Sequence, residues 1–351
     1  MIQNKELDKE YWNIVKGLGI LFIVLGHCCF PIMNYVYAFH VPLFFFVSGY
    51  LYDENKYGDR PFDNFKRRMQ SNWLKYVLIY VIYICLHNVF INFQLLNVEA
   101  SVYSFSDVVK QIGLSIFFGG EEFLISPLWF VPVLVEASVM LGFIVTLSRK
   151  LSRNKAVRLI VQLVIVAIIT IMGYVIHSQD IVMFAYFHVA LIVMPYIWIG
   201  YLLRNYCASI KNYLKWYVAV LALVILILYA KDHLISLKDG FISPEMYIIA
   251  ILGIYVCLYL SMLIQKVRRV NGLFITMGVS TFFIMAFHFT IIRIIDRVYD
   301  GGVANVDFQS QPYLGHNLIL LPVYLILGIG IPILITELQN EVIKWQRHKK
   351  K

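Results

Sequence analysis

Ten apolar runs, each about 17 to 24 residues long, recur along the 351-residue chain and limit what it can fold into. A bilayer core of about 30 Å is crossed by roughly 20 residues of α-helix at 1.5 Å per residue. Hydrophobic residues make up 60% of the chain, which is more apolar surface than one soluble domain could bury. The sequence therefore predicts one all-α, polytopic membrane domain over residues 1–351, with ten transmembrane helices at about 13–31, 35–52, 73–92, 128–147, 157–176, 182–203, 214–230, 246–264, 273–296 and 317–337.

The loops between these runs indicate how the chain crosses the membrane. With nearby helix ends included, the N-terminus, the alternate loops and the C-terminus carry 25 Lys and Arg residues, against 5 in the intervening loops. Basic residues concentrate on the cytoplasmic side of membrane proteins. We therefore expect both termini in the cytoplasm and the chain in the plasma (inner) membrane. The longest connection, 93–127, contains GLSIFFGG, which is too short to cross and is expected to lie in the interface or to re-enter the membrane.

Charge and motif content exclude several other classes of protein. The net charge of +9 is spread over many loops, so we expect no nucleic-acid partner. No P-loop or dinucleotide-binding glycine pattern occurs. The five cysteines show no C-x-x-C spacing, and we expect reduced thiols and no metal site. We therefore expect any chemistry to take place within the membrane bundle.

The first apolar run, YWNIVKGLGILFIVLGHCCF at residues 11–30, holds two ionisable residues that are costly in lipid, Lys16 and His27. Their separation of eleven residues is a rise of roughly 16.5 Å and a rotation within ~20° of three full turns, so both lie on one helix face. Lys16 falls near the cytoplasmic mouth and His27 in the outer half. A cation can hold a phosphate, and an imidazole can take a proton from a hydroxyl. The alternatives are a lysine that extends to the interface and a histidine that only packs helices together.

The same stretch opens a pattern that is similar to a known family. DKEYWNIVKGLGILFIVLGH, followed by FHVPLFFFVSGYLY, resembles the opening signature of the membrane acyltransferase-3 family, and within it the polysaccharide and fucose O-acetylase-like branch. Three later segments are also similar to the family: LWFVPVLVE at 128–136, MPYIWIGYLL at 194–203 and GVSTFFIMAFHFTII at 278–292. The resemblance extends over nearly the whole chain and includes the number of spans.

The resemblance implies transfer of an acyl group, usually acetyl from cytoplasmic acetyl-CoA, to a hydroxyl of an extracytoplasmic polysaccharide or its lipid-linked precursor. It makes Lys16 the basic residue near the CoA and His27 the essential histidine. The family often carries two arginines three residues apart before the third span, whereas here Arg68 is followed by Ser71 at the second position. Arg67 or Lys66 could take the role of the second arginine. Arg67 and Arg68 are expected near the CoA phosphates.

Two further residues are candidates for catalysis. His40 begins the second half of the family's opening signature, at the outer end of the second span, and its alternative is an interfacial histidine. Glu136 is a carboxylate well inside the fourth span, where it could orient His27 or another histidine, or make only a structural hydrogen bond. Cys28 and Cys29, beside His27, leave an acyl-cysteine intermediate open, although direct transfer needs only a base.

Three residues near the outer side are candidates for contact with the acceptor. His288, like His27, lies 14 or 15 residues into a helix that runs outward. Arg293 could contact an anionic glycan, or could form a local ion pair with Asp296 one turn later. Trp129 belongs to a family segment, and its alternative is an anchor at the membrane interface.

Other classes of function remain open at this point. A ten-span glycan or small-solute transporter or flippase would show internal repeats or paired broken helices, and no convincing repeat is visible. A membrane scaffold without catalytic activity would not explain why Lys16 and His27 lie on the same helix face. We therefore expect an acyl-CoA-dependent O-acetyltransferase with acetyl-CoA as donor and with a glycan acceptor and the lipid bilayer as partners. Assembly into a homo-oligomer is left open.

Overall fold

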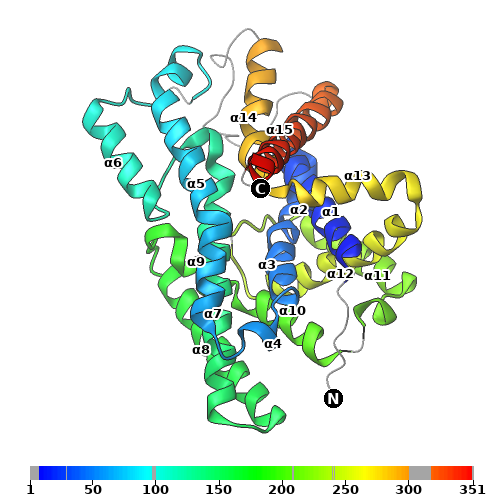
Figure 1. Ribbon diagram of the computed structural model, residues 1–351. Helices are drawn as coiled ribbons and strands as arrows, with labels where there is room; N and C mark the ends of the chain where they lie inside the picture. The colour runs from blue at the N-terminus through cyan, green and yellow to red at the C-terminus, as the bar shows by residue number, and fades with distance from the viewer. Residues whose placement is uncertain are drawn as a thin grey trace.

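The computed structural model describes residues 8–28, 30–96, 100–207, 209–238, 240, 242–299 and 318–349 (Figure 1). Helices and loops make up this part of the chain, with no extended strand, and the predicted all-α class is confirmed. In order, the α-helices are α1 (Lys9–Cys28), α2 (Phe30–Tyr37), α3 (His40–Tyr50), α4 (Glu54–Tyr57), α5 (Pro61–Asn92), α6 (Phe105–Ile116), α7 (Phe130–Leu151), α8 (Lys155–His177), α9 (Phe187–Ile192), α10 (Met194–Tyr206), α11 (Trp216–Ala230), α12 (Met246–Lys266), α13 (Arg268–Val279), α14 (Thr281–Tyr299) and α15 (Leu321–Lys349).

Six helical segments are long and apolar enough to cross a membrane, and each matches a predicted span. They are α1, α5, α8, α12, the segment Phe123–Leu151 that ends in α7, and Leu321–Gln346 within α15. Two further spans are present as bent helix pairs, which raises the number to eight. The protein is therefore a multi-pass membrane protein. The start of the tenth predicted span, residue 317, and His316 lie outside the described residues.

The spans predicted over 182–203 and 273–296 are each broken in two. Helices α9 and α10 meet at 55°, and α13 and α14 meet at 85°. Pro195 follows the first break, and proline at that place cannot donate the hydrogen bond that would continue the ladder. The second break lies at Gly278–Ser280, a Gly/Ser pair of the kind at which sharp kinks occur. Both breaks lie within runs that were predicted as single spans, so the length of the apolar runs did not indicate either.

The two remaining predicted spans correspond to short helices. Helix α3 has 11 residues and α11 has 15, against about 20 for a helix that crosses the whole core. Helix α3 starts at His40 rather than at residue 35, because α2 ends at Tyr37 and a turn separates the two. The full number of ten spans therefore stays a prediction.

The predicted re-entrant piece is displaced along the chain. GLSIFFGG ends amphipathic helix α6 and continues into a loop, whereas the next segment, the 3-10 helix η1 (Phe123–Trp129), enters the bundle. Leu124, Ile125 and Leu128 of η1 have no exposed surface. This buried segment leads directly into α7, and it brings Ser126 and Trp129 next to the outer half of α1.

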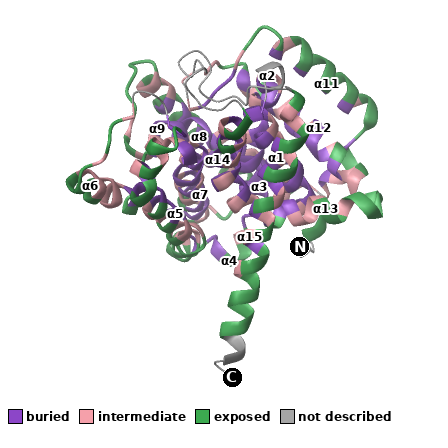
Figure 2. Ribbon diagram, turned by 90° about the horizontal axis from the view of Figure 1, so that it is seen from above, coloured by how far each residue is buried: buried purple, intermediate pink, exposed green. Residues whose placement is uncertain are grey.

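Helix α1 lies at the centre of the bundle. It packs against α2, α3, α12, α13, α14 and α15. In Figure 2, α1 and α3 are mostly buried, whereas α11 at the edge is mostly exposed. Helix α13 lies against the first half of α1, since a Cβ on Gly17 would stand 2.1 Å from the carbonyl oxygen of Phe274. The helix that carries Lys16 and His27 is therefore surrounded by protein rather than by lipid.

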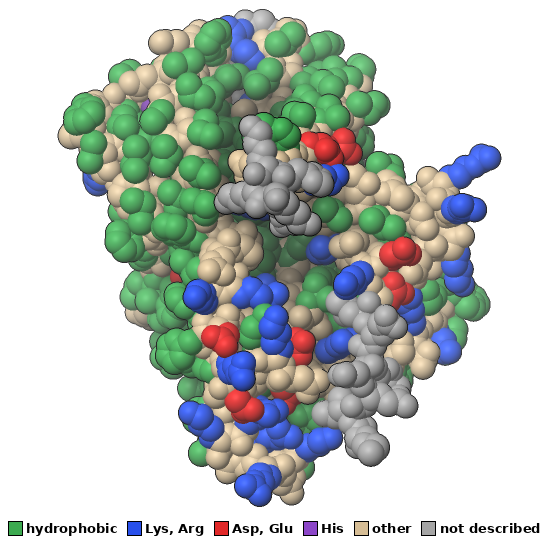
Figure 3. Space-filling model, in the orientation of Figure 1, with side chains coloured by type: hydrophobic (Ala, Val, Ile, Leu, Met, Phe, Trp, Pro, Cys, Tyr) green, Lys and Arg blue, Asp and Glu red, His purple; other side chains and the backbone are tan. Residues whose placement is uncertain are grey.

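Basic residues gather at one end of the molecule. Figure 3 shows Lys and Arg side chains concentrated on the lower half of the visible face, where Figure 1 places α4 and the first turns of α5. At this end Arg149 pairs with Glu54 and Asp59 at 2.9 and 2.8 Å. The distribution agrees with the cytoplasmic side that loop charges predict. Residues 1–7 and 350–351 lie outside the described residues, and the cytoplasmic location of both termini stays a prediction.

Helices α3 and α10 cross with their backbones in contact. A Cβ on Gly49 would stand 1.8 Å from the carbonyl oxygen of Ile197, and one on Gly200 would stand 2.0 Å from that of Phe46. Small residues at helix crossings allow this approach in membranes.

Gly49→Ala is expected to destabilise the protein by about 1–3 kcal/mol through overpacking, measured as a lower midpoint of thermal unfolding in detergent. The matched control is Gly330→Ala on α15, where a Cβ meets nothing within 4 Å. Equal midpoints for the two variants would contradict the packing described.

Candidate functional site

Four side chains on one face of α1 lead from its first turn to its last turn. Trp12 stacks on Tyr50 of α3 with ring centroids 4.0 Å apart. Lys16, Ile23 and His27 follow at intervals of four, seven and four residues, which return to the same face of a helix. Because α1 is continuous from Lys9 to Cys28, the predicted common face of Lys16 and His27 is realised along one straight element.

The hydrogen bonds of His27 determine which ring nitrogen carries its proton. Nδ1 lies 2.8 Å from the carbonyl oxygen of Ile23, one turn earlier. A carbonyl oxygen only accepts, so Nδ1 must hold the proton and donate it. In the neutral ring, Nε2 then carries the lone pair. The Tyr37 hydroxyl donates to Nε2 at 3.3 Å. His27 therefore presents a proton acceptor to a hydroxyl group, which is the arrangement that a general base requires.

His288 of α14 lies behind His27 rather than beside the pocket. Its Nδ1 donates to the carbonyl oxygen of Ile284 at 2.7 Å, so its Nε2 is an acceptor. This Nε2 lies 3.2 Å from Nδ1 of His27. The Nδ1 proton of His27 is thus shared between Ile23 and His288. His288 has no exposed surface and is not among the residues that line the pocket. His288 therefore contacts His27 and not the pocket.

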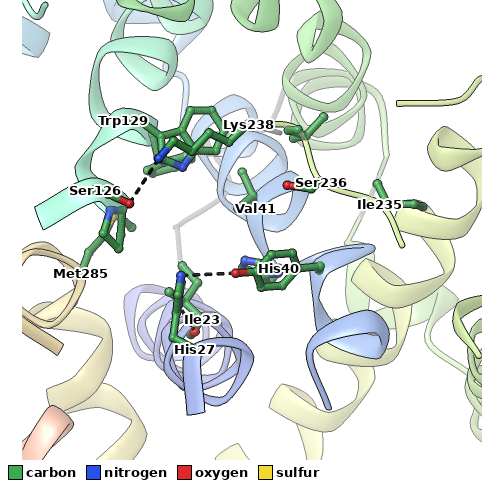
Figure 4. Close-up of a pocket in the computed structure, with 14 residues that line it drawn as sticks. Ile23, His27, His40, Val41, Ser126, Trp129, Ile235, Ser236, Lys238 and Met285 are labelled. Carbon is green, nitrogen blue, oxygen red and sulfur yellow. Dashed lines mark hydrogen bonds between the residues drawn. The ribbon is translucent and has the colours of Figure 1, made fainter. Parts of the chain in front are cut away.

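A pocket opens next to Nε2 of His27. Its free volume is about 50 Å³, which is room for a few water molecules. Segments far apart in the chain contribute its walls: α1, the α2–α3 turn, η1, α14 and the loop between α11 and α12. Figure 4 shows His27 and His40 on one side of it and Trp129, Ser126 and Lys238 on the other.

His40 and Trp129 both line this pocket, as the sequence predicts for site residues. His40 is 4% exposed, and its Nδ1 donates to the carbonyl oxygen of Val36 at 2.7 Å. Its ring lies 4.8 Å from the ring of Tyr37. His40 is therefore joined to His27 through Tyr37 rather than by direct contact. Trp129 ends η1 and has one ring neighbour at 5.8 Å, Tyr186.

Glu136 makes no hydrogen bond to a histidine within the described residues. It is half-buried, its Oε2 has no hydrogen-bond partner among the described residues, and it does not line the pocket. The positions on His27 where an orienting group would bind are taken by Ile23, Tyr37 and His288. The orienting role of Glu136 toward His27 or another histidine stays a prediction, and the main-chain carbonyl of Ile23 accepts the hydrogen bond from Nδ1 of His27.

Arg293 is not among the described residues that line the pocket. It is 1% exposed and lies over the rings of Phe123 and Phe289 at 5.3 and 5.1 Å. Asp296, one turn later, accepts a hydrogen bond from the Tyr324 hydroxyl of α15. The arginine thus lies in the core between η1, α14 and α15, and Phe289 lies between it and His27, with its ring 5.6 Å from the His27 ring.

Lys16 stands at the opposite end of the same face of α1. It is half-buried, and it makes no hydrogen bond or ion pair with the described residues. A partly desolvated ammonium without a carboxylate partner is a suitable place for an anionic ligand. A lysine that extends fully into the interface, the simpler alternative, would be exposed.

Arg67 and Arg68 lie at the start of α5 near a set of polar atoms with no partners. Arg67 lies over the Tyr57 ring at 5.0 Å. Nε of Arg68, the Tyr52 hydroxyl and Oδ1 of Asn64 are buried without a hydrogen bond among the described residues. Buried polar groups in proteins are normally paired, so such a set indicates a place for water or a polar ligand. These atoms could bind water or the oxygens of an anionic ligand.

Sequence reasoning missed three residues of the pocket: Tyr37, Ser126 and Lys238. The only signal for Tyr37 was its closeness in the chain to His27 and His40. Nothing in the spacing of Ser126 or Lys238 indicated that two distant loops meet. Cys28 is fully buried and does not line the pocket, and Cys29 lies outside the described residues. Among the described residues, no group of three His, Cys, Asp or Glu side chains could hold a metal ion.

Comparison with known proteins gives one match. The model of the Acyl_transf_3 family, described as an acyltransferase domain, matches residues 9–337. No curated protein matches this chain. No solved structure matches it. The match begins at the first residue of α1 and ends within α15, so it contains the pocket and both ends of the Lys16–His27 face.

Proposed function

This chain belongs to the acyltransferase-3 family, and on that basis we propose that it moves an acetyl group from cytoplasmic acetyl-CoA to a hydroxyl of an extracytoplasmic polysaccharide or its lipid-linked precursor. The proposal places it in the polysaccharide and fucose O-acetylase-like branch, in the plasma (inner) membrane. Family membership supports a membrane acyltransferase and does not favour the transporter alternative.

The observation that carries the proposal is the orientation of His27. Its Nδ1 proton is held by Ile23 and His288, and its Nε2 lone pair meets a hydroxyl at the edge of a pocket. An acceptor hydroxyl that takes the place of the Tyr37 hydroxyl would donate to the same nitrogen. The proton moves to Nε2, the acceptor oxygen attacks the thioester carbonyl, and the carbon–sulfur bond breaks. The departing thiolate of CoA then takes the proton.

His288 acts in this scheme as a positioning residue. When Nε2 of His27 accepts the proton, the ring becomes an imidazolium, and its Nδ1–H becomes a stronger donor. The Ile23 carbonyl and Nε2 of His288 already accept from that position. They keep the ring from turning and stabilise the charge that forms, in the way that a third group supports the base in nucleophile systems.

The donor is proposed to enter from the cytoplasmic end. Lys16 lies roughly 16.5 Å below His27 along α1, and an extended pantetheine arm is of comparable length. Lys16 and Arg68 are cations in partly or fully buried surroundings, and Arg67 is close by at the start of α5. Together they would bind the phosphates of CoA while the thioester reaches His27 through the bundle.

The most direct test of the activity compares glycans from cells with and without the gene. We expect the O-acetyl signals in the NMR spectrum of the envelope polysaccharide to disappear without the gene and to return when it is restored. The positions of the lost signals would also identify the acceptor hydroxyl. O-acetyl signals that persist unchanged in the deletion strain, with no other acylation lost, would contradict the proposal.

A further inference from the structure

One wall of the pocket beside His27 is the short segment η1. Ser126 and Trp129 of this segment line the pocket, and Figure 4 shows them across from His27. Short 3-10 helices have poor hydrogen-bond geometry, and the backbone of η1 departs from helical angles at Ile125. Contacts with neighbouring elements must therefore determine where this wall stands.

The first contact is a chain of two hydroxyl groups that ends on the backbone of η1. Oγ1 of Thr290 in α14 donates to the carbonyl oxygen of Leu124 at 2.9 Å. The hydroxyl proton of Thr290 is used in this bond, so the Tyr83 hydroxyl of α5, 2.8 Å away, is the donor to Thr290. All three residues are buried, and successive hydrogen bonds in such a chain strengthen one another. Helices α5 and α14 are thus both joined to η1 at this point.

The second contact joins α5 to Glu122, the residue that precedes η1. His87 lies one turn after Tyr83 on the same face of α5, and its Nδ1 lies 3.0 Å from Oε2 of Glu122. Its Nε2 lies 3.2 Å from the carbonyl oxygen of Ser101, which only accepts, so Nε2 carries a proton. Glu122 accepts from Nδ1 as a carboxylate and donates to it when protonated, so the link exists in either form. Both side chains are buried.

The ring of His87 is itself fixed in place. Tyr103 stacks on it, with ring centroids 3.5 Å apart and planes 4° from parallel. The neighbouring Asn88 makes two hydrogen bonds to the backbone of Tyr103, at 2.8 and 2.9 Å. His87 therefore gives Glu122 a rigid support.

Helix α14 joins this wall to the base. His288, two residues before Thr290, has its Nε2 3.2 Å from Nδ1 of His27. Between them, Phe289 has its ring 5.6 Å from that of His27 and 5.4 Å from that of Phe123 in η1. Three successive residues of α14 therefore contact either the base or η1.

From these contacts we propose that Thr290 and Glu122 are positioning residues for the acceptor, which act through η1 to hold Ser126 and Trp129 in their place opposite His27. The inference rests on the proposed function and adds two residues to it that are not among the described residues lining the pocket. A wall that also samples other places binds its ligand less tightly, in proportion to the fraction of the protein in the competent arrangement. Loss of either contact should therefore raise the KM for the acceptor and leave the KM for the donor unchanged.

Thr290→Val tests the first contact, because it removes the hydroxyl and nearly keeps the shape of the side chain. The carbonyl of Leu124 loses its donor in a buried place, so we expect the acceptor KM to rise by about 5- to 50-fold. The matched control is Thr146→Val. Thr146 is also 6% exposed and also donates at 2.9 Å to a backbone carbonyl, that of Gly142, but within its own helix α7. This control should keep the wild-type acceptor KM.

Glu122→Ala tests the second contact, and Glu122→Gln tests its rescue. The alanine variant leaves Nδ1 of His87 without this partner and should raise the acceptor KM by about 5- to 50-fold. A glutamine amide can donate to Nδ1 or accept from it, so Glu122→Gln should stay close to wild type. Glu121→Ala removes the exposed neighbouring carboxylate and should also behave as wild type.

All variants are assayed as purified full-length protein in lipid nanodiscs. The donor is radiolabelled acetyl-CoA, and the acceptor is total envelope glycan from cells that lack the gene. Each KM is measured with the other substrate saturating, and the midpoint of thermal unfolding is recorded beside it. Should Glu122→Ala fail to accumulate in the membrane, Thr290→Val and its control still decide.

Two results would overturn the inference. One is an acceptor KM for Thr290→Val equal to that of Thr146→Val, whatever the change in the unfolding midpoint. The other is an equal rise of the donor and acceptor KM in Thr290→Val or Glu122→Ala, which is what general loosening of the fold would give. Either result, with an active wild-type protein, would leave the proposed function intact. An absence of wild-type transfer to the glycan, or full activity of His27→Ala, would count against the proposed function itself.

Discussion

His27→Ala is expected to lower the rate of acyl transfer by about 10²–10⁴, the usual contribution of a general base, and in cells to abolish detectable O-acetylation. The substitution removes the one side chain whose Nε2 accepts a proton at the inner end of the pocket while its Nδ1 is fixed by Ile23 and His288. The acceptor hydroxyl would then have to lose its proton without help. The rate is measured with saturating donor, so that it reports the chemical step.

Two comparisons separate chemistry from folding for this variant. His27→Gln keeps a side chain that fills the space and donates a hydrogen bond, yet it offers no comparable base, so it should be as inactive as the alanine variant. His233→Ala removes an exposed histidine whose ring stacks on Tyr229, and it should behave as wild type. A native rate for His27→Ala at normal protein levels would contradict the mechanism. His288 and His40 would then become the leading candidates for the base.

Lys16→Ala is expected to weaken the use of acetyl-CoA by about 10- to 100-fold in KM, because it removes a charged hydrogen-bond donor from the donor's phosphates. Lys16→Arg should lose much less, since a guanidinium also binds phosphate. The acceptor KM should not change, because the lysine lies about three helical turns from the pocket. Lys9→Ala, which removes an exposed lysine from the first turn of the same helix, is the matched control.

The Lys16 variants should change the KM for the donor and leave the KM for the acceptor unchanged. A rise in the acceptor KM with an unchanged donor KM would contradict the placement of the donor at the cytoplasmic end. So would equal effects of Lys16→Ala and Lys9→Ala.

Properties that depend on one continuous helix could be predicted from the sequence. The register of Lys16 and His27 is a matter of helical geometry alone, and α1 has that geometry. The all-α class and most of the spans follow from the length of apolar runs. The family resemblance, first visible in motifs, is confirmed over residues 9–337, while the particular branch stays a proposal.

Properties that depend on contacts between distant segments could not be predicted. The contact between His27 and His288 joins residues 261 positions apart, and no spacing rule connects α1 to α14. The breaks in α9–α10 and α13–α14 occur inside predicted single spans, and the length of an apolar run does not reveal a bend. Glu136 is a carboxylate within a span, but its position in the sequence does not show which groups hold the ring of His27. The contact between Lys238 and Ser126 joins the α11–α12 loop to η1, and no spacing rule connects these two segments.

The central claim is that donor and acceptor meet at His27 from opposite sides of the membrane, and proteoliposomes test it most directly. The envelope glycan is enclosed in the lumen, and radiolabelled acetyl-CoA, which does not cross the bilayer, is added outside. Wild-type protein should acetylate the enclosed glycan, and His27→Ala protein and protein-free liposomes should not. Label that enters the glycan only when donor and acceptor are present on the same side of the bilayer would contradict the account.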